Sequence, residues 1–284
     1  MIDLSRAERE VTIATNATVL TIGGSDPSGG AGLQADLKTF QQLGCYGMAV
    51  VSLLTVQNTQ GVDGIELVSA DFVTKQLDAV THDIVPRVIK TGALGSADLI
   101  EAVAVRLSEL KLPVVVDPVL ISKHGHSLAD DSAIQAYRNL LMPLATLFTP
   151  NRFEAAALLG RELNSAQDFA QAAADLLSLG PSFVLLKAGT INGRQHHMFA
   201  SEEGVQGIEM PTLESNNTHG AGCVLSAAIS GCLAIRLSDV VEPAIVLEAV
   251  RFALSAVHNA IEFAPELGKG VGPVETRVVH LGDQ

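Results

Sequence analysis

The chain has no tryptophan and only three cysteines among its 284 residues. Cys45, Cys223 and Cys232 are widely spaced and form no C-x-x-C pair. We therefore expect neither a disulfide framework nor a zinc site, and a reducing cytoplasm is favoured. Basic residues are also scarce, because 18 Lys and Arg stand against 31 Asp and Glu, a formal net charge of −13. This balance argues against nucleic acid or an anionic membrane as partner.

Long uncharged apolar runs are missing as well, so we expect no segment that spans a bilayer. The first 17 residues carry Arg6, Glu8, Arg9 and Glu10 and lack an apolar core. Residues 1–17 are therefore expected to be a surface extension rather than a secretory signal. Hydrophobic residues still make up 48% of the chain. That content can build a large aliphatic core, and we expect a single domain over residues 18–284.

Short apolar runs rich in β-branched residues alternate with longer stretches of helical period. This order predicts an α/β fold with a mostly parallel sheet covered on both faces. The predicted strands are 19–22, 47–56, 61–68 as an edge, 88–90, 114–117, 146–149 and 183–187, with a hairpin of 196–200 and 207–210. The predicted helices are 31–43, 70–81, 97–110, 129–141, 153–159, 166–179 and two between 222 and 264, broken near 237–238.

Ligands of such folds bind beyond the carboxyl ends of the strands. The residues at these predicted ends are Gly24, Gln57, Lys90, Asp117, Asn151 and Lys187. Asp117 closes an apolar strand, where a carboxylate is costly unless it faces a site, a metal or a donor. Lys187 is suited to neutralise the charge of a phosphate.

Some polar residues allow two interpretations. Asn151 and Glu154 fit an ordinary capping box at a helix start, but Glu154 also suits a position near Mg²⁺, which prefers hard oxygen ligands. Asp36 could bind an amino group on a heterocycle or be a solvated helix charge. His196 and His197 have no further ligand at metal spacing, so we expect them at the surface.

A glycine-rich loop over residues 23–32 permits close backbone approach to a ligand. It lacks the G-K-[ST] ending of a P-loop. Residues 30–35 match G-x-G-x-x-A, but no acidic residue near Gln57 is placed to bind a ribose. A nicotinamide site is therefore disfavoured.

Residues 217–223 are the most informative segment of the chain. Gly220 and Gly222 flank Ala221 ahead of a predicted helix, so unpaired backbone N–H groups and the helix dipole converge on an anion site. Cys223 starts that helix, a position that lowers the pKa of a thiol and makes it a usable base. The segment predicts phosphate binding beside proton transfer, and the alternative is a plain junction with a buried cysteine.

Together these segments resemble the ribokinase-like superfamily and, within it, the hydroxymethylpyrimidine and phosphomethylpyrimidine kinases of thiamin synthesis. The resemblance runs from about Val19 to Pro273. Its motifs are 24–39, 56–59, 117–119, 149–151 with Glu154, 217–220 with 222–223, and 268–273. It implies a three-layer α/β/α sandwich and a cytoplasmic homodimeric kinase that acts with ATP and Mg²⁺ on a pyrimidine alcohol and its monophosphate. A monovalent cation is a further cofactor that it leaves open.

The resemblance also implies a role for each matching residue. The pyrimidine pocket would be lined by Gly24, Asp36, Gln57 and Val119. The anion hole would be formed by Gly220, Ala221, Gly222 and Cys223, with Cys223 as the base. Asp117 and Glu154 would lie near Mg²⁺, and Asn151, Lys187 and Thr218 near the nucleotide.

The chain departs from the family pattern at several positions. Ala221 replaces a threonine, and Ala93 replaces a methionine that touches the substrate ring, which opens space. A pyridoxal kinase of the same fold is therefore the nearest alternative, although relatives with a second active-site cysteine carry it at the position of Ser122. A non-catalytic vitamin-binding protein is disfavoured by the retained polar residues. Residues 123–126 are expected to be a lid rather than an exposed turn.

Overall fold

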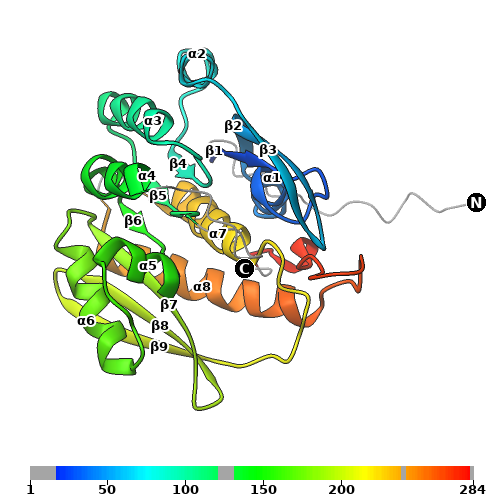
Figure 1. The fold of residues 1–284 in the computed structure, drawn as a ribbon, viewed down its shortest axis with the longest axis vertical. Helices are drawn as coiled ribbons and strands as arrows, with labels where there is room; N and C mark the ends of the chain where they lie inside the picture. Colours follow the sequence, from blue (N-terminus) through cyan, green and yellow to red (C-terminus); the bar gives the residue numbers. More distant parts are fainter. Residues whose placement is uncertain (1–16, 121–130, 238–240, 282–284) are drawn as a thin grey trace, which may run out of the picture.

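The computed structural model describes residues 17–120, 131–237 and 241–281, and these form one nine-stranded sheet in the order β3-β2-β1-β4-β5-β6-β7-β8-β9 (Figure 1). The strands are β1 (Thr18–Ser25), β2 (Tyr46–Asn58), β3 (Gly61–Leu67), β4 (Val88–Thr91), β5 (Val114–Val116), β6 (Leu147–Phe148), β7 (Phe183–Ile191), β8 (Arg194–Ser201) and β9 (Gly204–Pro211). The central strands from β2 to β7 pair in parallel, whereas β3, β8 and β9 join antiparallel at the two edges.

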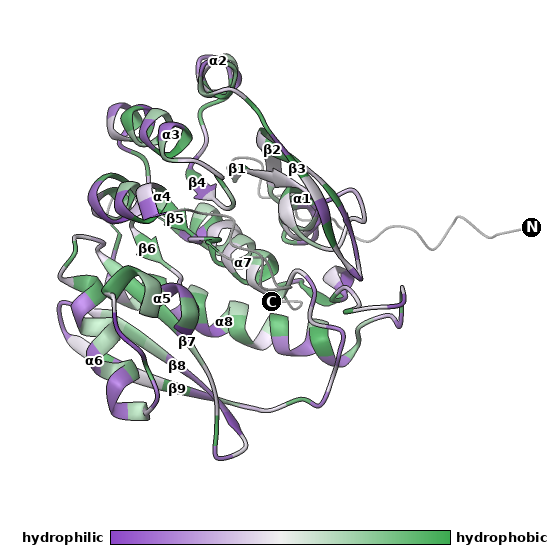
Figure 2. Cartoon of the chain, in the orientation of Figure 1, coloured by the Kyte–Doolittle hydropathy of each residue, from purple (hydrophilic) through white to green (hydrophobic). Residues whose placement is uncertain are grey.

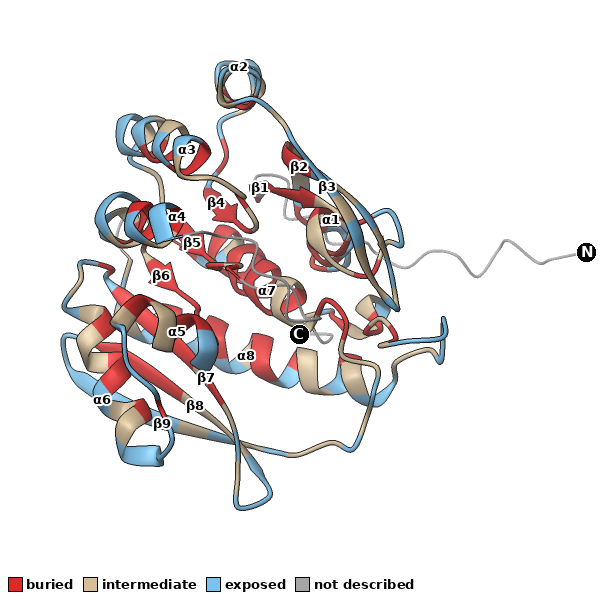
Figure 3. Ribbon diagram, in the orientation of Figure 1, coloured by how far each residue is buried: buried red, intermediate tan, exposed pale blue. Residues whose placement is uncertain are grey.

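Helices cover both faces of the sheet. They are α1 (Gly32–Gln42), α2 (Ala70–Thr81), α3 (Ala97–Leu110), α4 (Asp131–Ala136), α5 (Arg152–Leu159), α6 (Ala166–Leu177), α7 (Ala221–Arg236) and α8 (Pro243–Glu262). One apolar core lies under α2 to α6, and a second core joins α1, α7 and α8 to the opposite face. The three-layer α/β/α sandwich with a mostly parallel sheet is confirmed. Strands β5 and β6 are both apolar and buried (Figures 2 and 3).

Helices α2 and α3 each begin at a serine whose side chain caps the helix. The Ser69 hydroxyl accepts a hydrogen bond from the Phe72 N–H at the start of α2. Ser96 does the same for Leu99 at the start of α3. Each cap satisfies a first-turn donor that the helix itself leaves unpaired. Both helices have the bounds that the sequence predicts.

Several predicted elements have different lengths. Strand β7 was expected to end at Lys187 but continues to Ile191, because it pairs with β8 in an antiparallel hairpin. Strand β3 is the edge strand that was expected. The helix predicted over 129–141 is α4 followed by one π-helical turn, Tyr137–Leu141. Helix α7 begins one residue earlier than predicted, at Ala221.

Helix α8 contradicts the expectation that no segment is long and apolar enough to span a bilayer. By length and composition Pro243–Glu262 qualifies, with a mean hydropathy of 1.4. Its buried residues, among them Val246, Ala253 and Ala260, belong to the core shared with α7. A core helix passes the same test, so this helix is weak evidence for a membrane.

Three expectations fall outside the described residues. They concern the extension over 1–16, the lid over 123–126 and the position of Ser122. Ala17, which the sequence places in the extension, is buried, and its carbonyl accepts a hydrogen bond from the Tyr46 N–H at 2.9 Å. The division into an extension and a single domain stays a prediction.

Candidate functional site

A cavity of about 280 Å³ opens at the carboxyl ends of the central strands, where the first turns of α1 and α7 meet them. Its lining includes every residue to which the sequence assigns a site role. These residues are Gly24, Asp36, Gln57, Asp117, Val119, Asn151, Glu154, Lys187, Thr218, Gly220, Ala221, Gly222 and Cys223. The predicted site residues are therefore brought together around one space.

The first turn of α7 forms a cup of backbone amides at the cavity. Gly220 caps the helix with φ +82°, and a Cβ there would lie 1.8 Å from the Gly30 carbonyl oxygen. The Ala221 N–H reaches the Thr218 carbonyl at 3.3 Å. Amides in a first helical turn lack carbonyl partners within the helix, and the dipole adds positive potential. The residues 220–223 thus have the geometry of an anion site.

Cys223 corrects the sequence expectation about its thiol. Burial raises the pKa of Cys223 to about 11, although the Lys90 ammonium and the Gly32 N–H act to lower it. The position at the helix start was expected to lower this pKa. Desolvation of a thiolate outweighs that effect in the ligand-free protein. The sulfur lines the cavity in its thiol form at neutral pH.

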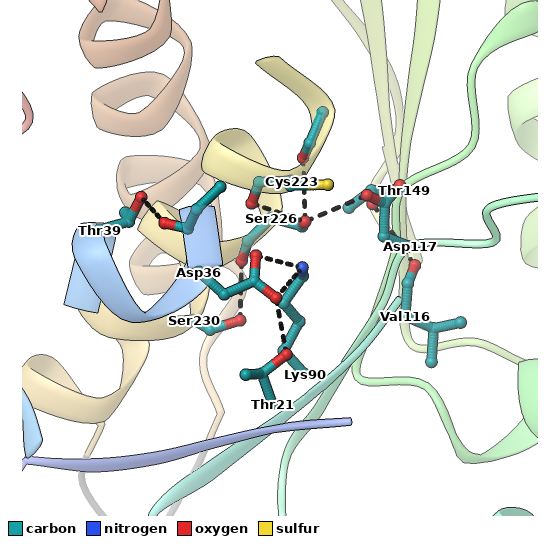
Figure 4. Close-up of polar contacts among 12 residues, drawn as sticks. Thr21, Asp36, Thr39, Lys90, Val116, Asp117, Thr149, Cys223, Ser226 and Ser230 are labelled. Atoms are coloured by element: carbon teal, nitrogen blue, oxygen red, sulfur yellow. Dashed lines mark hydrogen bonds and ion pairs between the residues drawn. The ribbon is translucent and has the colours of Figure 1, made fainter. Parts of the chain in front are cut away.

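Asp36 is neither a solvated charge nor a free acceptor. Its carboxylate is 1% exposed and bonds the Lys90 ammonium at 2.5 and 2.6 Å, while the Thr21 hydroxyl donates to it at 2.7 Å (Figure 4). Burial would lower the pKa of Lys90, but the Asp36 carboxylate outweighs it and keeps the ammonium charged. Both Asp36 oxygens therefore already have strong donors.

Asp117 lies in a second polar cluster beneath α7. One oxygen accepts from Lys187 at 3.0 Å. The same oxygen accepts from the Thr149 hydroxyl, and the other accepts from Ser226 at 3.2 Å, as Figure 4 shows. A Cβ on Gly222 would lie 3.8 Å from both Asp117 Oδ2 and Lys187 Nζ. The ion pair thus faces the amide cup directly.

Glu154 and Asn151 form the capping box that the sequence left open. The Asn151 side chain accepts from the Glu154 N–H, and the Glu154 carboxylate accepts from the Asn151 N–H at 2.7 Å. Burial raises the pKa of Glu154 to about 8, against the opposing charge of Lys187. The capping box alone accounts for the position of Glu154. Its carboxylate is also buried near Asp117, which is compatible with binding a cation.

The cavity offers Mg²⁺ two carboxylates, Asp117 and Glu154. Among the described residues no group of three or more His, Cys, Asp and Glu is placed to hold a metal. Mg²⁺ keeps several waters and is commonly held by one or two carboxylates together with substrate phosphates. Asp117 and Glu154 interact with each other and with the same lysine. This pair fits a hydrated Mg²⁺ that is completed by phosphate oxygens.

His219 joins the glycine loop to α7 and to the C-terminal segment. Its imidazole is 2.8 Å from Asp26 Oδ2 and 3.5 Å from Gln57 Nε2. Burial would raise the pKa of Asp26, but the hydrogen bonds from His219 and Ser28 outweigh it and lower this pKa to about 2. The His219 backbone bonds Gly272 and Val274, at 2.9 and 3.1 Å. Gln57 is held at the rim of the cavity by the Thr55 hydroxyl, which donates to its Oε1 at 3.1 Å.

An apolar wall completes the cavity beside Gly24. Leu53 is 2% exposed, and its Cδ1 lies 2.5 Å from the place of a Cβ on Gly24. Ala93 Cβ is 3.8 Å from the same place. Leu53 therefore borders the space that the small Ala93 side chain leaves open. Val119 lies on the same cavity.

His197 is not the surface residue that was expected. Its Nδ1 is buried and has no hydrogen-bond partner among the described residues. Burial lowers the pKa of His197 to about 4, with Lys187 and His196 adding to the effect. His197 pairs with Lys187 across β7 and β8.

Among the cavity residues that the sequence did not assign to a ligand are Lys90, His219 and Leu53, although Lys90 was named as a strand-end candidate. A lysine within the apolar strand Val88–Thr91 was a usable signal, because buried lysines require a partner. His219 stood inside the glycine motif without a role. Leu53 gave no signal, since an apolar residue in a strand is ordinary core.

The comparisons with known proteins agree on one family. The phosphomethylpyrimidine kinase model matches residues 26–275. The chain is 41% identical over 261 residues to a hydroxymethylpyrimidine/phosphomethylpyrimidine kinase of Streptomyces coelicolor, covering 92% of this chain and 94% of that one.

Two solved structures are also similar to this chain over most of its length. A phosphomethylpyrimidine kinase from Clostridium difficile has a TM-score of 0.74 at 36% identity, covering 86% of this chain and 99% of that one. The ADP complex of Bacillus subtilis pyridoxal kinase has a TM-score of 0.82 at 34% identity, covering 92% and 98%. With the matched family model and the relative at 41% identity, these show that the chain belongs to the phosphomethylpyrimidine kinase family.

Proposed function

We propose that this kinase transfers the γ-phosphoryl group of ATP to 4-amino-5-hydroxymethyl-2-methylpyrimidine and then to its monophosphate, giving the diphosphate used in thiamin biosynthesis. One observation carries the proposal. The amide cup of α7, the Asp117–Lys187 ion pair and the Cys223 thiol line a single small cavity. Family membership supplies the reaction class, and the cavity supplies the groups that this reaction needs.

The cup is proposed to stabilise the phosphoryl group during transfer. Backbone amides of 220–223 point a positive helix end at the cavity, and preorganised donors of this kind are the main catalytic device in phosphoryl transfer. Lys187 adds a charge on the opposite wall, with Asn151 and Thr218 at its margin. Asp117 and Glu154 would hold Mg²⁺, which neutralises charge on the phosphates when bound.

The ring is proposed to lie against Gly24, Leu53 and Val119, with Gln57 as its hydrogen-bonding partner. The oxygen of the hydroxymethyl group attacks the γ-phosphorus as the bond to the β-phosphate oxygen breaks. Its proton passes to the Cys223 thiolate, which forms beforehand when the thiol releases its proton to solvent water and which becomes a thiol again on accepting the hydroxyl proton. Asp36 is not proposed as a direct ring ligand, because Lys90 and Thr21 occupy its oxygens.

Release of ADP from ATP tests the proposal with three acceptors: the pyrimidine alcohol, its monophosphate and pyridoxal. Turnover with both pyrimidines, and a kcat/KM for them well above that for pyridoxal, is the expected result. The likeness to pyridoxal kinases and the small Ala93 make pyridoxal the specific alternative. Preference for pyridoxal would establish that alternative, and no release with any acceptor would indicate a non-catalytic binding protein.

We also propose a homodimer, with the outward face of β2 as its interface. Leu54 and Val56 are 48% and 62% exposed on the face of β2 opposite to Leu53. Light scattering of the wild type and of Leu54→Asp tests this, since the substitution should yield monomers. A monomeric wild type would contradict it. A cytoplasmic location and a monovalent cation remain predictions from the sequence.

A further inference from the structure

A buried ion pair lies under the cavity and has no part in the proposed contacts with the ring or the phosphates. Lys90 and Asp36 are each 1% exposed, and both Asp36 oxygens lie within 2.6 Å of the Lys90 ammonium. Thr21, the β1 neighbour of Lys90 in the sheet, donates the remaining hydrogen bond. The pair thus joins β1, β4 and α1 beneath the start of α7.

Fold stability alone does not account for this pair. Taking two charges out of water costs several kcal/mol per ion, and apolar replacements of a buried ion pair are often neutral or stabilising. The other residues of β4 are Val88, Ile89 and Thr91, and all three are fully buried. A charged pair at such a position therefore indicates a function besides stability.

The nearest such reason is the thiol above it. Lys90, Asp36 and Cys223 line the same cavity, and Figure 4 shows the Cys223 side chain above the ion pair. Lys90 attracts negative charge on the sulfur, whereas Asp36 and Asp117 oppose it. Lys187 also acts on the sulfur from β7, but its ammonium is engaged by Asp117. The Gly32 N–H at the start of α1 completes the surroundings.

We propose that Lys90 is a positioning residue for the reaction, whose ammonium stabilises negative charge on Cys223 Sγ, and that Asp36 keeps this ammonium charged and in place. The proposal rests on the proposed function for its catalytic meaning. The electrostatic coupling itself can be measured on the protein without any substrate.

The charge of Lys90, and not its packing, should act on the sulfur. Loss of the Lys90 charge in Lys90→Met leaves the anions to dominate, so the thiolate forms at higher pH. Lys90→Arg keeps the charge, so the thiolate should form close to the wild-type pH. A purely structural role of the Lys90 side chain would move both variants alike.

The experiment follows alkylation of Cys223 by iodoacetamide between pH 7 and pH 10, with mass spectrometry of the modified peptide. Cys45 and Cys232 are buried, and Cys223→Ala measures their background. At a fixed pH below the thiol pKa, we expect Lys90→Met to react at least tenfold more slowly than wild type. A tenfold change corresponds to one pKa unit. Lys90→Arg keeps the charge and should stay within threefold.

Folding is checked by circular dichroism for each variant. Where Lys90→Met does not fold, Lys90→Gln removes the charge with a polar side chain and carries the same expectation. An unchanged alkylation rate in the uncharged variant, or an equal loss of rate in Lys90→Arg, would overturn the proposal. The alkylation requires no phosphate acceptor, so a wrong substrate assignment would fail in the ADP assay and leave this result untouched.

Discussion

The two glycines of the amide cup should respond in opposite ways to the same added methyl group. At Gly220, φ is +82° and a Cβ would lie 1.8 Å from the Gly30 carbonyl oxygen, so the backbone must shift. At Gly222, a Cβ would lie 3.8 Å from Asp117 Oδ2 and from Lys187 Nζ, an ordinary contact distance. Gly222→Ala therefore fits the fold, and Gly220→Ala does not.

The two substitutions should change the stability of the fold in opposite directions. Gly222 is the second residue of α7, and alanine is favoured over glycine in a helix by up to about 1 kcal/mol, which raises Tm by roughly 2–4 °C. The new methyl group nevertheless occupies the space between the cup and Lys187. The methyl group should therefore keep the reacting oxygen away from the backbone amides. Loss of even one such preorganised donor typically lowers kcat by roughly 10²–10³. Gly220→Ala should cost at least about 1–2 kcal/mol from the left-handed backbone alone.

Thermal unfolding and ADP release, measured in parallel on both variants, separate these effects. Gly222→Ala should melt at or above the wild-type temperature and be nearly inactive, whereas Gly220→Ala should melt lower. A Gly222→Ala protein with unchanged stability and wild-type kcat would refute the reasoning, because phosphoryl transfer would then not use this space. Unfolded Gly222→Ala would contradict the geometry at residue 222.

Three further predictions follow from the site. Cys223→Ala should slow phosphorylation of the alcohol more than that of the monophosphate, because the attacking phosphate is already anionic; equal losses in single-turnover rates would contradict this. Ala93→Met should raise KM by crowding Leu53, and Leu53→Ala added to it should restore binding; strictly additive effects in the double-mutant cycle would show that the two side chains share no space. His197 has a folded pKa of about 4 against 6.5 when free, so the unfolded chain binds more protons and stability falls as pH drops from 6.5 towards 4. His197→Gln should flatten this part of the Tm profile, and an unchanged slope would exclude His197 as its source.

The sequence predicts the fold well where local signals agree with tertiary packing. Serine caps mark the starts of α2 and α3, and apolar runs mark the central strands. Strand β7 is longer than predicted because its last residues pair with β8, and pairing partners are not visible in a local pattern.

The sequence likewise predicts one part of the candidate site and not another. Motif order placed every assigned residue on one cavity, because strand ends of a parallel sheet converge. It did not reveal the partner of Asp36, since Lys90 lies in another strand and the pair forms only after β1, β4 and α1 assemble. The direction of the Cys223 pKa was also wrong, because a helix start can be read from sequence but the depth of burial cannot.

His219 is anchored on both its backbone groups by residues 272–274. The turn that follows it, which is proposed to bind phosphate, is thus completed by residues that are made after the whole sheet. A nascent chain that has not yet produced residue 274 lacks these two bonds, however well its sheet has formed. Catalytic competence should therefore arrive only after residue 274 has been made and this segment has packed against the turn.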